Sequence, residues 1–112
     1  MGDRANIKIE AEDEEPIFLY THWNGYCLPE TLQTALARKE RWNDSQYLTR
    51  IIFSEMIKAD VLDEHGYGIS TIVHDGDDRI ITVNCVDQTV TIRDLIWTFE
   101  EFININIGLV SF

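Results

Sequence analysis

The chain has 112 residues, of which 45% are hydrophobic and 11% aromatic, and its net charge at pH 7 is −11. This length suits a single domain over residues 1–112, and the apolar content is too high for a disordered segment. The negative charge disfavours direct binding of nucleic acid. No apolar run reaches membrane-spanning length and no signal peptide opens the chain, so we expect a soluble, cytoplasmic protein with no membrane partner.

Two strands are expected at the start of the chain. Residues 5–9 alternate apolar and polar side chains, as a half-buried strand does. The acidic residues 10–16 connect this strand to a second, more continuously apolar one at residues 17–23. A turn signal, Asn24 followed by glycine, comes next, so His22, Trp23 and Asn24 are expected in a tight turn.

A first helix is expected to begin at Leu28, because Pro29 costs nothing in a first turn, where its missing N–H needs no partner. Leu28, Leu32 and Leu36 recur at helical spacing and predict the buried face of this helix. A basic and aromatic elbow, RKERW at residues 38–42, separates it from the next helix.

A second helix is expected over residues 44–59, capped by a pairing of Asn43 with Gln46. Apolar side chains lie on both of its sides, which indicates either a helix sandwiched inside the domain or a subunit interface. Glu55 falls within the main apolar stripe, where a carboxylate is rare unless it is paired. It is either a structural acid bonded to an arginine or a carboxylate of a functional site.

The second half of the chain predicts mainly strands. A three-stranded meander is expected, because short apolar runs alternate with turn signals such as the acidic residues 75–78. A short helix is expected in the segment WTFEEFIN, and the apolar ending, residues 105–112, forms either a final strand or a docked tail. The strands are expected at residues 69–74, 79–86 and 89–92, and the helix at residues 97–104.

These elements follow the order ββ-αα-βββ-α and predict an α+β fold. The economical arrangement is an antiparallel sheet of about five strands with the helix pair packed on one face. Parallel pairing is disfavoured, because strands and helices do not alternate along the chain.

The sequence offers no sign of metal or covalent chemistry. His22, His65 and His74 lack the spacing of zinc ligands. Neither a nucleophile elbow nor a glycine-rich phosphate loop is present. Cys27 and Cys85 are expected to be reduced thiols, since two cysteines are too few for a disulfide framework. We therefore expect no metal ion and no cofactor, and nothing in the sequence favours an enzyme.

A basic and aromatic island interrupts the acidic chain. Residues 36–58 carry a charge balance of +2, whereas the rest of the chain carries −13. Arginines donate paired hydrogen bonds to phosphate or carboxylate, and flat aromatic rings stack on bases, so the island and the preceding turn suggest a ligand-binding site. The alternative is that Trp23 and Trp42 are core anchors and that the arginines balance the acidic surface. The candidate residues are Tyr20, His22, Trp23, Asn24, Arg38, Arg41, Trp42, Tyr47 and Arg50.

Several motifs of the chain resemble one family. The segments MGDRANI, YTHWNG, LPETLQTALAR, RWND, YLTRIIF and GYGIS are similar to those of small uncharacterised proteins encoded by bacteria and their phages. The resemblance runs from Met1 to about Val90 and resumes at WTFEEF, whereas residues 105–110 do not match it. It implies no settled activity, but it marks polar and aromatic residues as well as core ones, which favours a shared pocket and adds Arg4 to the ligand-binding candidates. Its signature residues here are Arg4, Asn6, Thr21, His22, Trp23, Gly25, Arg41, Trp42, Asp44, Arg50, Gly66, Gly68 and Ser70.

Three functions remain open at this point. The first is a non-catalytic binding protein, phage-encoded or phage-related, that sequesters a small anionic, nucleotide-like ligand to counter host defence. The second is an acidic, protein-directed inhibitor or nucleic-acid mimic, with carboxylates at residues 10–15 and 75–78 facing a basic partner. The third is a small self-associating domain without a ligand. All three are compatible with a homo-oligomer, expected to be a dimer, in the cytoplasm of a bacterial host cell.

Overall fold

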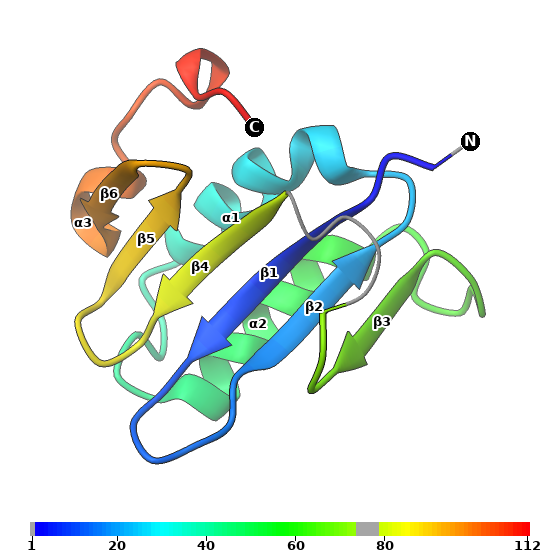
Figure 1. Ribbon diagram of the computed structural model, residues 1–112, viewed down its shortest axis with the longest axis horizontal. Coiled ribbons are helices and arrows are strands. Elements are labelled where there is room, and N and C mark those ends of the chain that lie inside the picture. Colours follow the sequence, from blue (N-terminus) through cyan, green and yellow to red (C-terminus); the bar gives the residue numbers. More distant parts are fainter. Residues whose placement is uncertain (1, 74–78) are drawn as a thin grey trace.

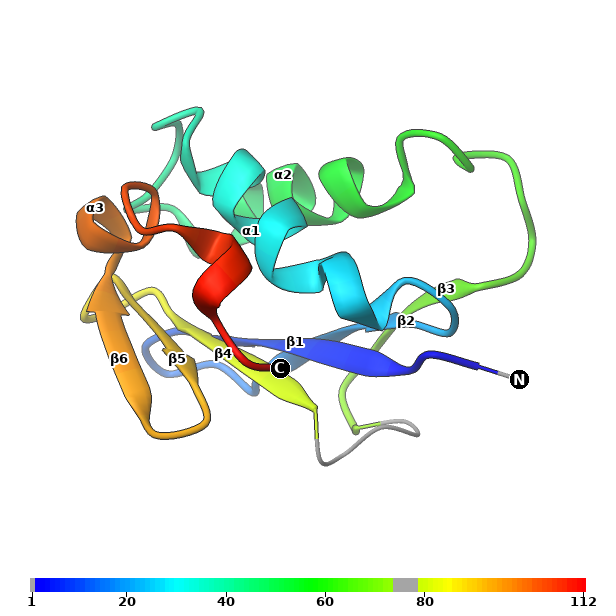
Figure 2. The same ribbon diagram turned by 90° about the horizontal axis from the view of Figure 1, so that it is seen from above.

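The computed structural model describes residues 2–73 and 79–112. In these residues six strands form one sheet, and the helices α1 (Leu28–Leu36) and α2 (Ser45–Ile57) cover one of its faces (Figure 1, Figure 2). The expected α+β fold, with the helix pair on one side of the sheet, is therefore confirmed. The strands are β1 (Ala5–Glu10), β2 (Ile17–Thr21), β3 (Tyr67–Ser70), β4 (Ile80–Asn84), β5 (Thr89–Ile92) and β6 (Leu95–Thr98).

The sheet is mixed, so the prediction of a purely antiparallel sheet of about five strands is wrong. Its strand order is β3-β2-β1-β4-β5-β6, and the central strands β1 and β4 run parallel, whereas all other neighbours are antiparallel (Figure 1). Parallel neighbours need a long connection, and here it contains β2, both helices and β3. The alternating apolar side chains of β4 look the same for either direction of pairing, so the sequence has no local signal for the parallel pair.

The prediction of a meander after the helix pair is wrong for its first strand, β3, which does not pair with β4. β3 pairs with β2 at the edge of the sheet, so β2 and β1 separate it from β4. The observed meander consists of β4, β5 and β6, and the predicted helix wrongly included Trp97 and Thr98 of β6. The turn predicted at residues 75–78, together with His74 at the end of the predicted strand, lies outside the described residues.

The helix pair agrees closely with the sequence analysis. Pro29 lies in the first turn of α1, and the leucines of its predicted stripe are buried. α2 begins one position later than expected, because Asp44 and not Asn43 is its N-cap residue. The Asp44 carboxylate accepts a hydrogen bond from the Tyr47 backbone N–H at 3.4 Å, which satisfies one of the free donors at the helix start.

The second apolar side of α2 is partly covered by the chain itself. Phe53 and Ile57 are half-buried and pack against core residues. Glu55 is a structural acid: its side chain is 14% exposed and pairs with Lys58 at 2.8 Å. The expected arginine partner is therefore replaced by a lysine one turn along the helix.

The end of the chain docks on α1 and does not extend the sheet. The Gln33 side-chain amide on α1 donates to the carbonyl oxygens of Phe102 and Ile105, at 3.0 Å each. The final residues lie beside α1 (Figure 2), so the docked-tail alternative is confirmed. The elements of this region are α3 (Phe99–Phe102) and a 3₁₀ turn (Ile107–Leu109).

One apolar layer lies between the sheet and the helix pair. A row of side chains crosses the sheet in register, from Leu19 on β2 through Ile7 and Ile81 to Ile92 on β5. Each of these four residues is at most 1% exposed. The opposite face carries no helix in the part of the chain that the structure describes (Figure 2).

Ile7→Ala should lower the free energy of unfolding by about 2–5 kcal/mol, because Ile7 is fully buried on a central strand. Ile96→Ala is the matched control: Ile96 lies on the edge strand β6 and is 67% exposed. Its truncation should change stability by about 0.5 kcal/mol or less. Urea unfolding followed by tryptophan fluorescence measures both, and equal losses would contradict the central position of β1.

Candidate functional site

A hollow opens where β2 ends and β3 begins. The His22 backbone N–H donates to the Gly66 carbonyl oxygen at 2.8 Å, which extends the pairing of the two strands to this point. The hollow has a volume of about 330 Å³, within the range of small-molecule sites. All of its lining residues except one glycine carry an aromatic or imidazole ring. They are Tyr20, His22, Trp23, His65, Gly66 and Tyr67.

Hydrogen bonds hold the His22 ring in one orientation and one tautomer. The Arg4 Nε–H donates to His22 Nδ1 at 3.3 Å, and the Tyr20 hydroxyl lies 3.1 Å from the same nitrogen. Because a guanidinium only donates, Nδ1 acts as an acceptor, and the proton of the neutral ring lies on Nε2. The His22 ring is thus positioned by contacts with Arg4 and Tyr20.

Trp23 forms one wall of the hollow and rests on Gly66. Trp23 is 40% exposed, so the interpretation of this residue as a core anchor is wrong. Its ring meets His22 edge-on at 5.7 Å and Tyr67 edge-on at 6.4 Å between centroids. Gly66 has φ +91°, and a Cβ there would overlap the six-membered ring of Trp23. Glycine is therefore required for the backbone conformation and for the close approach of the indole.

The rim beside Tyr67 is polar. The Asn24 side-chain amide donates to the Tyr67 hydroxyl oxygen, and this hydroxyl lies 3.4 Å from a carboxylate oxygen of Asp60. Burial raises the pKa of Tyr67, so its hydroxyl stays protonated at neutral pH and can donate to Asp60. The aromatic wall is therefore bordered by an amide, a phenol and a carboxylate.

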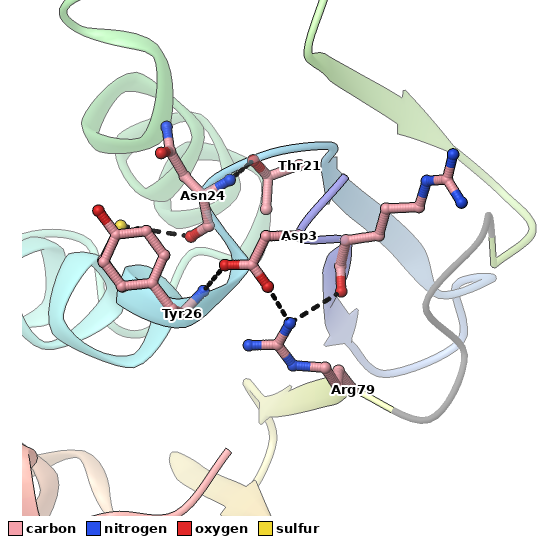
Figure 3. A network of polar contacts seen from close by, with 7 residues as sticks. Asp3, Thr21, Asn24, Tyr26 and Arg79 are labelled. Atoms are coloured by element: carbon pink, nitrogen blue, oxygen red, sulfur yellow. Dashed lines mark hydrogen bonds and ion pairs between the residues drawn. The ribbon is translucent and has the colours of Figure 1, made fainter. Parts of the chain in front are cut away.

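A network centred on Asp3 attaches the turn after β2, which contains a 3₁₀ segment (Gly25–Cys27), to the sheet (Figure 3). The Asp3 carboxylate pairs with Arg79, just before β4, and accepts from the Tyr26 backbone N–H at 2.8 Å. The Asp3 carbonyl oxygen accepts from the Gly25 N–H at 2.8 Å. A Cβ on Gly25 would lie only 2.7 Å from that oxygen, so glycine is needed for this approach. The hydrogen bond from Arg79 holds the pKa of Asp3 below its usual range.

The structure separates the predicted site residues into two groups. Arg4 and Asn24 lie with His22 and Trp23 at the end of β2. The elbow between the helices lies at the opposite end of the sheet, near the β1–β2 connection (Figure 1). The reason is the length of α1, whose nine residues span about 13 Å. The prediction that both groups line one hollow is wrong for the second group: Arg38, Arg41, Trp42, Tyr47 and Arg50.

Trp42 is a core anchor, in agreement with the alternative interpretation. Its indole N–H donates to the Leu36 carbonyl oxygen at 3.1 Å, and its ring packs edge-on against Phe99 at 5.4 Å. The neighbouring Arg41 guanidinium lies over the Tyr47 ring, 4.6 Å from its centroid. These contacts hold the elbow in place, so the aromatic residues of the island have a structural role.

The remaining cations of the second group lie at the surface. Arg38 is exposed and pairs with Glu40 at 3.4 Å. Arg50 is exposed on α2. Exposed ion pairs contribute about 0–1 kcal/mol, so the Arg38–Glu40 pair adds little to stability.

The cysteine nearest to the hollow in the sequence is Cys27, in the turn that follows β2. The Cys27 thiol donates to the Asn24 carbonyl oxygen at 3.3 Å, so it is engaged by the backbone of its own turn. Among residues 2–73 and 79–112, no three His, Cys, Asp or Glu side chains converge to hold a metal ion. No helix within those same residues is long and apolar enough to cross a membrane.

Sequence reasoning missed four contributors to the site. Tyr67 and His65 reach the hollow through the pairing of β3 with β2, which has no local signal. Asp3 and Arg79 are separated by 76 residues, so the sequence has no local signal for their ion pair either. One local signal could have pointed to His65 and Tyr67. Gly66 lies between these two ring-bearing residues, and a glycine next to a strand often marks a close approach of the backbone to another group.

Comparison with protein-family models, with curated proteins and with solved structures finds no match for this chain. The resemblance to small bacterial and phage proteins therefore stays a prediction. The site has to be interpreted from its own geometry.

Asp3→Asn should remove one source of acid sensitivity. Arg79 lowers the pKa of Asp3 below 3.8 in the folded protein, so this carboxylate stabilises the fold above about pH 4. That contribution is lost as the pH falls through the folded pKa. We expect the variant to be less stable than wild type by roughly 1 kcal/mol at neutral pH, with a smaller difference near about pH 2.

Thermal unfolding by circular dichroism at a series of pH values measures this difference. Asp13→Asn is the control, because Asp13 is exposed on the β1–β2 connection and makes no contact with Arg79. The stability difference between Asp13→Asn and wild type should be the same at neutral pH and near about pH 2. A stability difference for Asp3→Asn that is constant across the series would contradict the role of the ion pair.

Proposed function

We propose that this protein binds a small ligand with a flat aromatic ring and a single phosphate or carboxylate group, such as a nucleoside monophosphate, in the hollow beside His22. The observation that carries the proposal is the ring-lined wall formed by Trp23, His22 and Tyr67, with Trp23 supported from behind by Gly66. Stacking on aromatic side chains contributes about 1–3 kcal/mol per base and tolerates different bases. A wall that is already in place loses little conformational entropy on binding.

The charges around the hollow limit the charge of the ligand. Arg4 contacts His22 through Nε at the border of the hollow, and arginine suits a phosphate or a carboxylate. Asp60 lies on the Tyr67 side, and the whole chain has a net charge of −11. The elbow arginines are at the other end of the sheet, so they do not help to hold a polyphosphate (Figure 1). These features favour one phosphate over two or three.

The role that follows from binding without turnover is sequestration. A non-catalytic protein, phage-encoded or phage-related, would withhold a nucleotide-like signal from the defence proteins of the host cell. One observation and one expectation support this role. The observation is a described lining that consists of rings and not of nucleophiles. The expectation is the resemblance of the motifs to small proteins of bacteria and their phages.

Isothermal titration calorimetry with adenosine, AMP and ATP tests the proposal. AMP should bind more tightly than adenosine, which lacks the phosphate, and more tightly than ATP, which carries too much charge. Trp23→Leu should weaken AMP binding by about 10-fold or more, because it removes the stacking wall. Arg4→Ala should remove the preference for AMP over adenosine.

Arg41→Ala is the matched control for Arg4→Ala, since it removes an exposed arginine at the opposite end of the sheet. It should bind AMP as wild type does. The proposal fails if AMP, the monophosphates of the other bases and cyclic nucleotides all fail to bind at high micromolar concentrations. It also fails if Arg41→Ala and Arg4→Ala weaken binding equally.

A further inference from the structure

A second hollow lies at the other end of the sheet, between β3, the start of α2 and the β1–β2 connection. Its volume is about 330 Å³, and its floor consists of Ile9, Ile17 and Ile69. Ile69 on β3 is 59% exposed, so a large apolar side chain borders an apolar hollow that is open to water. A hollow with apolar walls that is open to water can receive an apolar side chain of a partner. The side chains that α2 contributes are Ser45, Gln46 and Thr49.

A free strand edge lies beside this hollow. β3 is at the edge of the described sheet (Figure 1) and pairs on its other side with β2. The hydrogen bond from His22 N to Gly66 O fixes which residues of β3 face β2, because hydrogen-bonded pairs alternate along antiparallel strands. In the observed register, the backbone N–H and C=O groups of Tyr67 and Ile69 point away from β2. An extended segment can add to such an edge as a further strand.

The rim of this hollow is strongly acidic. Glu14 and Glu15 line it, and Glu12 and Asp13 precede them on the same connection, with all four residues exposed. Within residues 2–73 and 79–112, the ion pairs of the structure involve none of these four carboxylates. Their charges favour a cationic partner. They disfavour a second copy of the chain, because two acidic rims would repel each other.

We propose that the β3 edge and this hollow form a docking site for an extended, basic segment of another protein. An aliphatic side chain of the segment enters the hollow, and neighbouring lysine or arginine side chains face Glu14 and Glu15. An engineered cavity of roughly 150 Å³ holds a benzene molecule, so a hollow of about 330 Å³ accommodates a large aliphatic side chain. The second hollow shares no lining residue with the hollow beside His22. The docking site as a whole meets that hollow only at Tyr67, whose backbone belongs to the β3 edge, and it does not depend on the ligand proposed there.

Fluorescence anisotropy with a labelled peptide that alternates lysine and isoleucine tests this proposal. The peptide should bind, and added salt should weaken the binding by screening the acidic rim. Ile69→Lys should weaken it by about 10-fold or more. Ile96→Lys is the matched control, because Ile96 is an exposed isoleucine on the opposite edge strand, and it should leave binding unchanged.

Two double variants separate the effect of the acidic rim on binding from the effect of the overall charge of the protein. Glu14→Gln with Glu15→Gln should weaken binding roughly 3- to 10-fold, as the loss of two exposed ion pairs predicts. Glu30→Gln with Asp94→Asn removes the same charge from exposed positions elsewhere and should leave binding unchanged. A peptide with alternate backbone amides methylated should not bind, because it cannot pair with β3.

Three results would overturn the proposal. The first is no peptide binding at concentrations up to about 1 mM. The second is equal weakening by Ile69→Lys and Ile96→Lys, which would show non-specific attraction to an acidic protein. The third comes from sedimentation: a concentration-dependent dimer of wild type that Ile69→Lys abolishes would mean that a second copy of the chain occupies the β3 edge.

Discussion

Asp3 connects the start of the chain to the segments that shape both the sheet and the hollow. Its carboxylate pairs with Arg79 just before β4, next to the bond from Asn6 N to Arg79 O at 3.0 Å that begins the parallel pairing of β1 with β4. It also accepts from Tyr26 N, in the turn that follows β2 (Figure 3). The Arg79 guanidinium lies over the Phe112 ring, 4.9 Å from its centroid, so the docked tail meets the same group. The ring-lined wall is therefore held in place by the central strands, and a ligand need not order it.

The helices and the first two strands could be predicted because their signals are local. Pro29 and the leucine stripe define α1, and alternating side chains define β1. The parallel pairing of β1 with β4 could not be predicted, since partners far apart in sequence leave no pattern in either strand. β6 was missed because a short apolar run suits a strand or a helix equally. The capping box of Thr98 and Glu101 would have set that boundary, since it marks the first turn of α3.

The candidate site was predicted in part for the same reason. His22, Trp23 and Asn24 are neighbours in the sequence, so their chemistry could be seen together and the structure keeps them together. The sequence places the elbow in the same site only by its composition. In the structure, the length of α1 separates the elbow from the turn after β2. Trp42 shows the consequence, because its indole closes the elbow by a bond to Leu36 O and does not face the hollow. Composition identifies residue types that can bind a ligand, but only the path of the chain decides which of them meet.

The indole N–H signals of the protein give the most direct test of a ligand site beside His22. The chain has three tryptophans, so a nitrogen–proton correlation spectrum recorded during titration with AMP reports on each one separately. The account predicts that the Trp23 indole and the Gly66 amide shift most, while the Trp42 indole stays in place. Shifts concentrated at Trp42 and Arg41, or no shift at Trp23 at saturating AMP, would contradict it.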